Sequence, residues 1–278
     1  MKPRWRRVAP AELDTWRRRL AEHPCEVGGH VRHMFALSCI DGFGVDVLRV
    51  VTDGERWGLV VVHPGRVLVP CGDPDLMAAA GSPTRRWRLL VGDAPAAEAV
   101  MGGAVPSGTR VHHQRYMTVD HDAVPSEREL PDPGLRRAVP EDLDRLANLA
   151  VRLHVDDEFG PDPGRPAYRG YRDRLMQTVD RGLVWVVGPV GAPFLKLERS
   201  VSSPVWGVQL SGIVSVRERR GQGLGRAAVA AAVRGALVEG PPDRPVSLHV
   251  RHANTPARTA YAAAGFVDRE EWRLAVRS

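Results

Sequence analysis

The stretch RRGQGLGR, residues 219–226, decides the fold, because it joins an apolar run to the start of an alanine-rich helix. Glycine adopts backbone conformations that other residues avoid, and it leaves space for a ligand beside the backbone. The spacing Arg220-x-x-Gly223-x-Gly225 lets several backbone N–H groups converge, and the helix that follows adds the positive end of its dipole. The stretch therefore predicts a cradle for an anionic diphosphate, with a tight strand-to-helix turn as the alternative.

The elements around this stretch alternate between strand and helix. They are the apolar strand VWGVQLSGIVSV (205–216), the helix GRAAVAAAVRGAL (225–237), the strand PVSLHVRH (245–252) and the helix NTPARTAYAAAGF (254–266). Asn254 or Thr255 can cap the last helix, Pro256 suits its first turn and Gly265 suits its C-terminal end. This helix is the second informative stretch of the chain.

The part of the second half that precedes these elements begins after a polar connector. It reads as a strand (135–139), a helix that starts at Pro140, a helix (168–181) and two strands (182–188 and 193–201). Asp156, Asp157 and Glu158 form an acidic cluster at the end of the first of these helices. The cluster is either a solvated face or a group that binds an amine or accepts its proton.

The first half predicts a similar order of elements without the glycine-rich stretch. A helix (11–23) precedes a small antiparallel meander (45–72), which is followed by helix, strand and helix (74–103) and a closing strand (111–120). The connector that contains Asp132, Pro133 and Gly134 places the domain boundary there. We therefore expect domains at 1–134 and 135–278, the first of them a decayed duplicate of the second.

The composition is that of a soluble globular protein of about two domains, since 43% of its 278 residues are hydrophobic and 26% are charged. No apolar run is long enough to span a bilayer, and no secretory signal is evident, so we expect a cytoplasmic location. The three cysteines, Cys25, Cys39 and Cys71, lack the spacing of a disulfide framework or a zinc cluster, and we expect no metal site.

The net charge of +6 belongs to the second half. Residues 1–135 hold 17 Lys and Arg and 17 Asp and Glu, whereas residues 136–278 hold 22 and 16. This excess favours an anionic cofactor in the half with the glycine-rich stretch, and it also suits a weak contact with nucleic acid.

The order of elements in the second half resembles the GCN5-related N-acetyltransferases (GNAT). Two motifs carry the resemblance over about residues 135–270: GIVSVRERRGQGLGRA (212–227), and Asn254, Ala257, Tyr261, Gly265 and Phe266. The stretches VDDEFGPDP, FLKLE and VQLSGIVSV also look like an actinobacterial subgroup whose N-terminal half is a degenerate acetyltransferase-like domain. The resemblance implies a mixed α+β fold of tandem GNAT-like domains, each a mostly antiparallel sheet flanked by helices.

The resemblance also implies acetyl-CoA as the cofactor. In the family the strand before the loop bulges and splays from its neighbour, which here falls on Val214, Ser215 and Val216. The second motif supplies Asn254, Ala257 and Tyr261 to the cofactor. The diphosphate would be covered by the loop residues Arg220, Gly221, Gln222, Gly223, Leu224, Gly225 and Arg226.

The family's chemistry assigns Tyr261 as the acid that protonates the departing thiolate, because a phenol with a pKa near ~10 is protonated at neutral pH. The base is less evident. Many members place a glutamate about where Gln209 stands here, and an amide cannot accept the proton. Glu198 is the next prediction, followed by Glu158 or an ordered water, while His249 is better explained as a packing residue.

The resulting hypothesis is direct transfer of an acetyl group to a primary amine of a small molecule or peptide, in a monomer or homodimer. One alternative is an aminoacyl-tRNA-dependent transferase with tandem GNAT-like domains, motivated by Arg217, Arg219 and Arg220. Another is a CoA-binding regulator without catalysis, motivated by Gln209. The sequence does not identify the acceptor amine.

Overall fold

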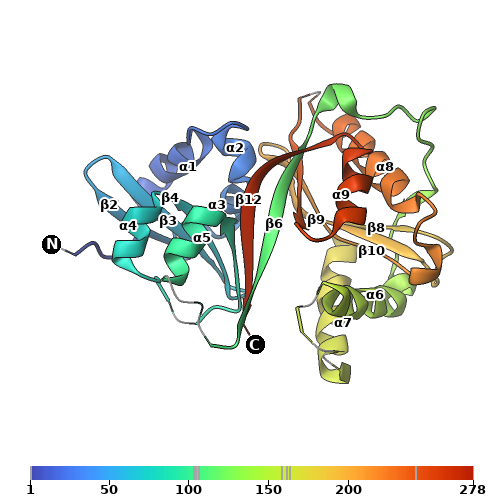
Figure 1. Ribbon diagram of the computed structural model, residues 1–278, viewed down its shortest axis with the longest axis horizontal. Helices are drawn as coiled ribbons and strands as arrows, with labels where there is room; N and C mark the ends of the chain where they lie inside the picture. Colours follow the sequence, from blue (N-terminus) through green and yellow to red (C-terminus); the bar gives the residue numbers. More distant parts are fainter. Residues whose placement is uncertain are drawn as a thin grey trace. The chain divides into compact units, whose positions relative to one another are not determined.

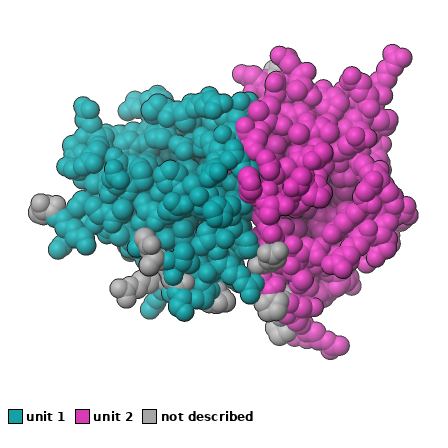
Figure 2. Space-filling view, viewed as in Figure 1, with its two compact units in different colours: residues 1–116, 269–278 teal, residues 117–268 magenta. Residues whose placement is uncertain are grey.

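The computed structural model describes residues 2–84, 86–102, 105, 107–157, 159–160, 162, 164–241 and 243–277. The chain forms two compact units (Figure 2). Unit 1 consists of residues 1–116 and 269–278, and unit 2 consists of residues 117–268. Each unit combines a mostly antiparallel sheet with helices, as the sequence predicted.

Unit 1 is built on an antiparallel meander. Its elements are the strands β1 (Arg6–Arg7), β2 (Leu48–Asp53), β3 (Arg56–His63), β4 (Val67–Gly72) and β5 (Leu89–Asp93), and the helices α1 (Leu13–Ala21), α2 (Gly29–Arg32), α3 (Met34–Phe43), α4 (Pro74–Ala80) and α5 (Ala94–Met101). The strands β2, β3 and β4 pair antiparallel, and β5 pairs parallel to β4. These elements confirm the meander and the helix, strand and helix predicted after it.

Two aspartates start the helices that cover one face of the unit 1 sheet. The carboxylate of Asp73 accepts a hydrogen bond from the N–H of Leu76 at 2.8 Å, and that of Asp93 accepts one from Ala96 at 3.1 Å. Each aspartate thereby caps the first turn of its helix, α4 or α5. The apolar side chains of both helices then pack on the sheet in one buried cluster.

Unit 2 repeats this order of strands with longer helices. Its elements are the strands β7 (Leu135–Arg137), β8 (Val184–Val187), β9 (Leu195–Ser203), β10 (Gly207–Ser215) and β11 (Val246–Arg251), and the helices α6 (Leu143–Asp156), α7 (Gly164–Asp180), α8 (Leu224–Val238) and α9 (Thr255–Ala262). The strands β7 to β10 pair antiparallel in order, and β11 pairs parallel to β10. The predicted elements of the second half are confirmed by this arrangement.

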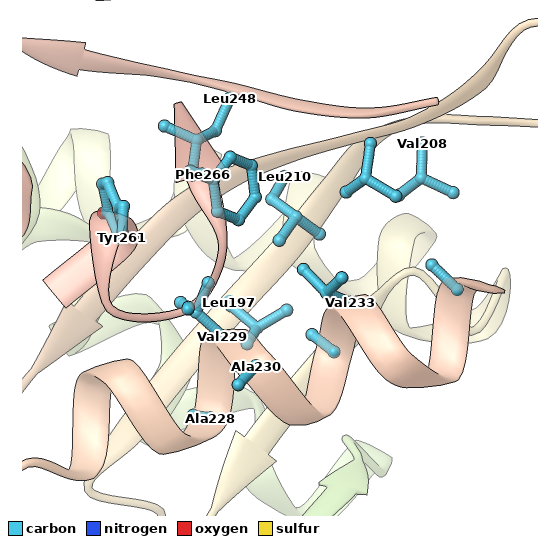
Figure 3. Close-up of a cluster of buried hydrophobic side chains, with 14 of the residues drawn as sticks. Leu197, Val208, Leu210, Ala228, Val229, Ala230, Val233, Leu248, Tyr261 and Phe266 are labelled. Carbon is cyan, nitrogen blue, oxygen red and sulfur yellow. The ribbon is translucent and has the colours of Figure 1, made fainter. Parts of the chain in front are cut away.

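The sheet of unit 2 lies between two helix layers, with α8 and α9 on one face and α6 and α7 on the other (Figure 1). The side chains of β9 alternate between these faces. Leu197 packs with α8 and α9 in the main core of the unit, which also holds Val208, Leu210, Val229 and Phe266 (Figure 3). Lys196 and Glu198 point to the opposite face, where Glu198 bonds to Arg174 of α7.

Two long strands, β6 (Thr109–Val119) and β12 (Phe266–Arg277), each belong partly to both units. β12 comes from the end of the chain and pairs antiparallel with β5 of unit 1. β6 comes from the first half and lies next to β11 in the strand order. The compact units therefore divide within these strands, whereas the sequence placed one boundary at 134, because β12 was not recognised as a strand of unit 1.

None of the helices in the described part of the chain combines the length and the hydropathy that crossing a bilayer requires.

Candidate functional site

The strands β10 and β11 of unit 2 separate toward their carboxyl ends. Their parallel pairing runs from Val208 to Leu210, where Leu210 lies opposite Leu248. Both strands continue beyond this point, β10 to Ser215 and β11 to Arg251. The result is an opening between the ends of two parallel strands, the location at which ligands bind in many α/β sheets.

A β-bulge at Gly212 re-aims the end of β10. Ser211 lies opposite Glu198 and Val214 lies opposite Lys196, so β10 has one residue more than β9 in this interval. Gly212 adopts a φ of 59°, which favours glycine. Ser211 and Val214 then both face α6 and α7, which strict alternation along a strand would forbid. The resemblance implied a bulge at Val214, Ser215 and Val216, whereas the register shift lies between Ser211 and Val214.

The predicted cofactor-binding residues at the end of β10 are Val214, Ser215 and Val216, and they differ in whether their backbone groups point toward the opening. The N–H of Val216 donates to the carbonyl of Phe194 at 2.9 Å, so it is committed to the side of β9. The side chains of Val214 and Val216 are buried against α6. Because backbone groups alternate in direction along a strand, those of Ser215 point toward the opening. Its carbonyl accepts hydrogen bonds from Arg220 at 3.2 and 3.3 Å.

The loop between β10 and α8 leaves its backbone accessible at the start of the helix. Gly221 and Gly223 both have a φ of 75°, and Gly223 is the N-cap residue of α8. A Cβ added to Gly221 or Gly225 would meet no atom within 4 Å. The first N–H groups of a helix have no partner within it, so this start of α8 has the donors and the space for an anion.

The other predicted loop residues have structural contacts of their own. Leu224 packs against the main core of unit 2. The side-chain amide of Gln222 donates to the carbonyl of Glu218 at 3.1 Å and so stabilises the loop. The guanidinium of Arg226 lies beside Gly223, where a Cβ would come within 3.4 Å of its Nε. Of these three side chains, Arg226 is the one that adds positive charge to the start of the helix.

Asp156, at the end of α6, joins this helix to the loop. Its carboxylate bonds to Arg220 at 2.6 Å and to Arg217 at 3.3 Å, and Arg152 lies 3.6 Å away. Burial alone would raise the pKa of Asp156, but the hydrogen bonds from Arg220 and Arg217 outweigh it and lower the pKa. The acidic cluster therefore orients the loop arginines through Asp156. Glu158, the second predicted base, lies outside the described residues.

The helix α9 begins after Asn254 and carries Tyr261 about two turns later. The Asn254 side chain accepts a hydrogen bond from the N–H of Ala257 at 3.2 Å, so it caps the helix, as the sequence predicted. Ala257 and Tyr261 both pack against the main core, in which Tyr261 is labelled in Figure 3. Burial, aided by the charge of Asp157, raises the pKa of Tyr261, so its phenol is protonated at neutral pH.

Glu198 is buried and ionised. One of its oxygens accepts from the ammonium group of Lys196 and the other accepts from Arg174 at 3.0 Å. Burial would raise its pKa, yet the charges of Lys196 and Arg174 lower it to about 2. A carboxylate with this pKa is a weak proton acceptor at neutral pH, because both oxygens are already bound to cations. The sequence missed both partners of Glu198.

The side chains of Gln209 and His249 form a buried polar pair on neighbouring strands. The Gln209 amide lies 3.4 Å from the His249 ring and also accepts a hydrogen bond from Ser200 at 3.1 Å. Burial lowers the pKa of His249 to about 3, so the ring is neutral at pH 7. This agrees with the prediction that His249 is a packing residue.

A cavity of about 180 Å³ opens in unit 2 beside the bulge. Its lining includes Tyr171 and Arg174 of α7, Lys196 and Glu198 of β9, and Ser211 and Gly212 of β10. His154 of α6 also lines it and bonds through Nδ1 to the Tyr171 hydroxyl at 3.1 Å. The cavity thus lies beside Ser211 and Gly212 of β10, and the glycine-rich loop follows the end of the same strand.

A sheet whose parallel strands separate beside a bulge, with a glycine-rich loop leading into a helix, defines the GNAT fold, and here the order of strands occurs twice. No family model matches the chain, and no curated protein sequence matches it. The solved structures with this fold include a GCN5-related N-acetyltransferase from Sphaerobacter thermophilus, at 16% identity and a TM-score of 0.60 over 99% of this chain and 95% of that one.

Two further structures cover nearly the whole chain. A GNAT-family acetyltransferase from Colwellia psychrerythraea matches at 11% identity and a TM-score of 0.58, over 99% of this chain and 100% of that one. A tandem GNAT protein from the clavulanic acid biosynthesis pathway matches at 18% identity and a TM-score of 0.53, over 98% and 97%. The chain therefore has a tandem GNAT fold, as the resemblance of its motifs implied.

Proposed function

We propose that this protein transfers an acetyl group from acetyl-CoA to a primary amine of a small molecule or peptide. The observation that carries the proposal is that unit 2 combines three features. These are the opening between β10 and β11, the accessible glycine-rich loop at the start of α8, and the helix that bears Tyr261. The tandem GNAT fold supports acyl transfer as the class of reaction.

The residues present fit the proposed cofactor. Its diphosphate would be held by the N–H groups of Leu224, Gly225 and Arg226 and by the guanidinium of Arg220, where Gly225 leaves space that a side chain would fill. The backbone of Ser215 would bind the arm of the cofactor along the opening. Bound there, acetyl-CoA supplies an acyl group activated as a thioester.

Tyr261 is proposed as the acid, because its hydroxyl oxygen holds a proton at neutral pH and can donate it to a thiolate. Glu198 is proposed to bind Lys196 and Arg174 instead of acting as the base predicted from the sequence, since its pKa is about 2. Water is then proposed to accept the proton that the amine loses. Glu158 stays a proposal for the same role.

The experiment that tests the proposal fills the cradle without disturbing the helix. Gly225→Leu places a side chain in the open space at the first turn of α8, and Gly235→Leu places the same side chain ten residues later in the same helix. Neither position has a neighbour within 4 Å of an added Cβ. Calorimetric titration with acetyl-CoA is expected to show at least about tenfold weaker binding for Gly225→Leu alone, which corresponds to ~1.4 kcal/mol.

Equal affinity of the wild type and Gly225→Leu would contradict the assignment of the loop. A screen for CoA release against amino acids, polyamines, aminoglycosides and lysine peptides tests the transfer itself. Tight acetyl-CoA binding without release for any amine would favour the regulator, and salt-sensitive binding of tRNA in a protein with no affinity for CoA would favour the aminoacyl-tRNA alternative.

A further inference from the structure

We infer that the acceptor amine carries a carboxylate group, which Arg174 and Lys196 bind in the cavity beside the β10 bulge. This inference rests on the proposed function, because it names the class of amine that the proposed transfer uses. It concerns residues that the glycine-rich loop and the Tyr261 helix do not include.

The position of the cavity suits an acceptor that extends toward the opening. Ser211 and Gly212 of β10 line the cavity, and Ser215, three residues further along the strand, directs its backbone into the opening. An extended strand rises by about 3.3 Å per residue, and the residues opposite Ser211 and Ser215 on β9 are three apart, so Ser211 and Ser215 lie about 10 Å apart along the sheet. A small molecule anchored in the cavity can therefore present its amine where the acyl group is proposed to lie.

The charges that line the cavity leave an excess of one positive charge. Lys196 and Arg174 are both cationic, and Glu198 is the carboxylate that they share. Lys196 is completely buried, so its charge is poorly screened by water. Buried charges are normally paired, and a ligand carboxylate would supply the second negative charge of this group.

Arg174 has an edge suited to a carboxylate. Its Nη1 bonds to Glu198 at 3.0 Å, and its side chain is 51% exposed. Within the described part of the chain, Nε and Nη2 of this guanidinium bond to no residue. These two nitrogens form one edge of the planar group, and such an edge binds a carboxylate through two parallel hydrogen bonds.

Lys196 adds a second donor from the floor of the cavity. Its ammonium group bonds to Glu198 and, at 3.0 Å, to the carbonyl of Gly212. An ammonium group has three N–H donors, so one remains for a ligand oxygen. The lining of the cavity also includes the apolar side chains of Ala150, Leu153 and Phe159, which suit a short hydrocarbon link between amine and carboxylate.

The experiment uses product-like probes that are not turned over. The N-acetyl derivatives of glycine, β-alanine, 4-aminobutyrate and 5-aminopentanoate, each with its carboxamide counterpart, are titrated into the full chain by calorimetry. At least one carboxylate is expected to bind about tenfold or more tightly than its own carboxamide, because the amide cannot pair with a cationic cavity. The series of spacings also measures the length of the link.

The variants identify the residue responsible. Arg174→Gln is expected to reduce the preference for carboxylate to about twofold or less, and Arg174→Lys is expected to retain part of it, because a point charge replaces the planar edge. Arg169→Gln removes an exposed arginine from the same helix that does not line the cavity, and it should leave the preference unchanged.

Three results would overturn the inference: equal binding of every carboxylate and its carboxamide, a preference that survives in Arg174→Gln, and no measurable binding of any carboxylate. Acetyl-CoA binding is measured in the same samples. A protein that binds acetyl-CoA but does not prefer carboxylates retains the proposed function and loses this inference. One that prefers carboxylates but does not bind acetyl-CoA retains the cavity assignment and loses the proposed function.

Discussion

Tyr261 is the residue on which the proposed proton transfer to sulfur depends. It lies on α9 with Ala257 one helical turn earlier, and both side chains pack against the main core of unit 2. Burial disfavours the phenolate, so the hydroxyl keeps its proton over the pH range in which most proteins are folded. The same core holds the side chain of Tyr261 in place, and its role as the acid stays a prediction from the motif.

Tyr261→Phe is expected to lower kcat by about 10²-fold or more, while the affinity for acetyl-CoA changes by about twofold or less, because only the proton donor is removed. Steady-state kinetics with an identified amine and calorimetry measure the two effects. Tyr116→Phe is the control, since the Tyr116 hydroxyl donates to the carbonyl of Val31 in unit 1 at 2.6 Å. It should lower the free energy of unfolding by about 1 kcal/mol and leave kcat unchanged. Unaltered turnover in Tyr261→Phe would remove Tyr261 from the mechanism.

Glu198 illustrates what the sequence reveals of a single residue and what it does not. Its place on the strand before β10 was predicted, and Lys196, two residues earlier, must share its face of the sheet. Arg174 lies on a helix 24 residues earlier, and no local pattern predicts that its guanidinium reaches the carboxylate. The pKa of a buried carboxylate depends on such contacts, so the role of Glu198 could not be read from its position alone.

The bulge of β10 is the element that joins the cavity to the opening. A Cβ on Gly212 would lie 2.8 Å from Glu198 Oε1 and 3.0 Å from Lys196 Nζ, and the residue has a φ of 59°. The bulge therefore requires glycine for two reasons, the backbone conformation and the closeness of the ion pair.

Gly212→Ala is expected to lower the free energy of unfolding by about 1–2 kcal/mol, because it strains the backbone and displaces a buried ion pair. Gly170→Ala is the matched control, since Gly170 lies inside α7 with no neighbour within 4 Å of an added Cβ. Alanine there should raise the free energy of unfolding by about 0.4–1 kcal/mol. Urea denaturation measures both values, and equal values for the two variants would refute the proposed constraint on the bulge.

Local sequence patterns predicted most of the helices and strands, but they did not predict the strand β12. The meander of unit 1, the helix α6 and the helix α8 have the apolar periodicity and the turn residues that predict them. The strand β12 contains FVDREEWRLAVR, in which four charged residues precede a tryptophan, and it does not read as a long strand. Its pairing with β5 is a contact between the two ends of the chain, which local patterns do not encode.

The two units as wholes differ at the position that corresponds to the glycine-rich loop. In unit 2, residues 216–223 separate β10 from α8. In unit 1, α4 starts at Pro74 directly after β4, and the Asp73 carboxylate occupies the first donors of the helix. A carboxylate at this place takes the N–H donors that a diphosphate would use, and its negative charge also repels a diphosphate. The prediction of a degenerate first domain is consistent with this difference.

Calorimetric titration of the whole chain with acetyl-CoA is therefore expected to give a stoichiometry of one. Gly225→Leu should weaken this single event at least about tenfold, since in the described part of unit 1 the corresponding helix start is already capped by Asp73. Two binding events in the wild type, of which one persists in Gly225→Leu, would show that unit 1 also binds the cofactor.

Through the strands β6 and β12, each half of the chain supplies one strand to the sheet of the other half. The first half, up to residue 134, supplies β6 to the edge of β11, and the second half supplies β12 to the edge of β5. In domain-swapped dimers, two copies of a chain exchange an element in a similar way. A fragment cut at the connector would carry an open sheet edge beside its parallel pair, and the natural partner for that edge is the other half or a second copy of the same fragment.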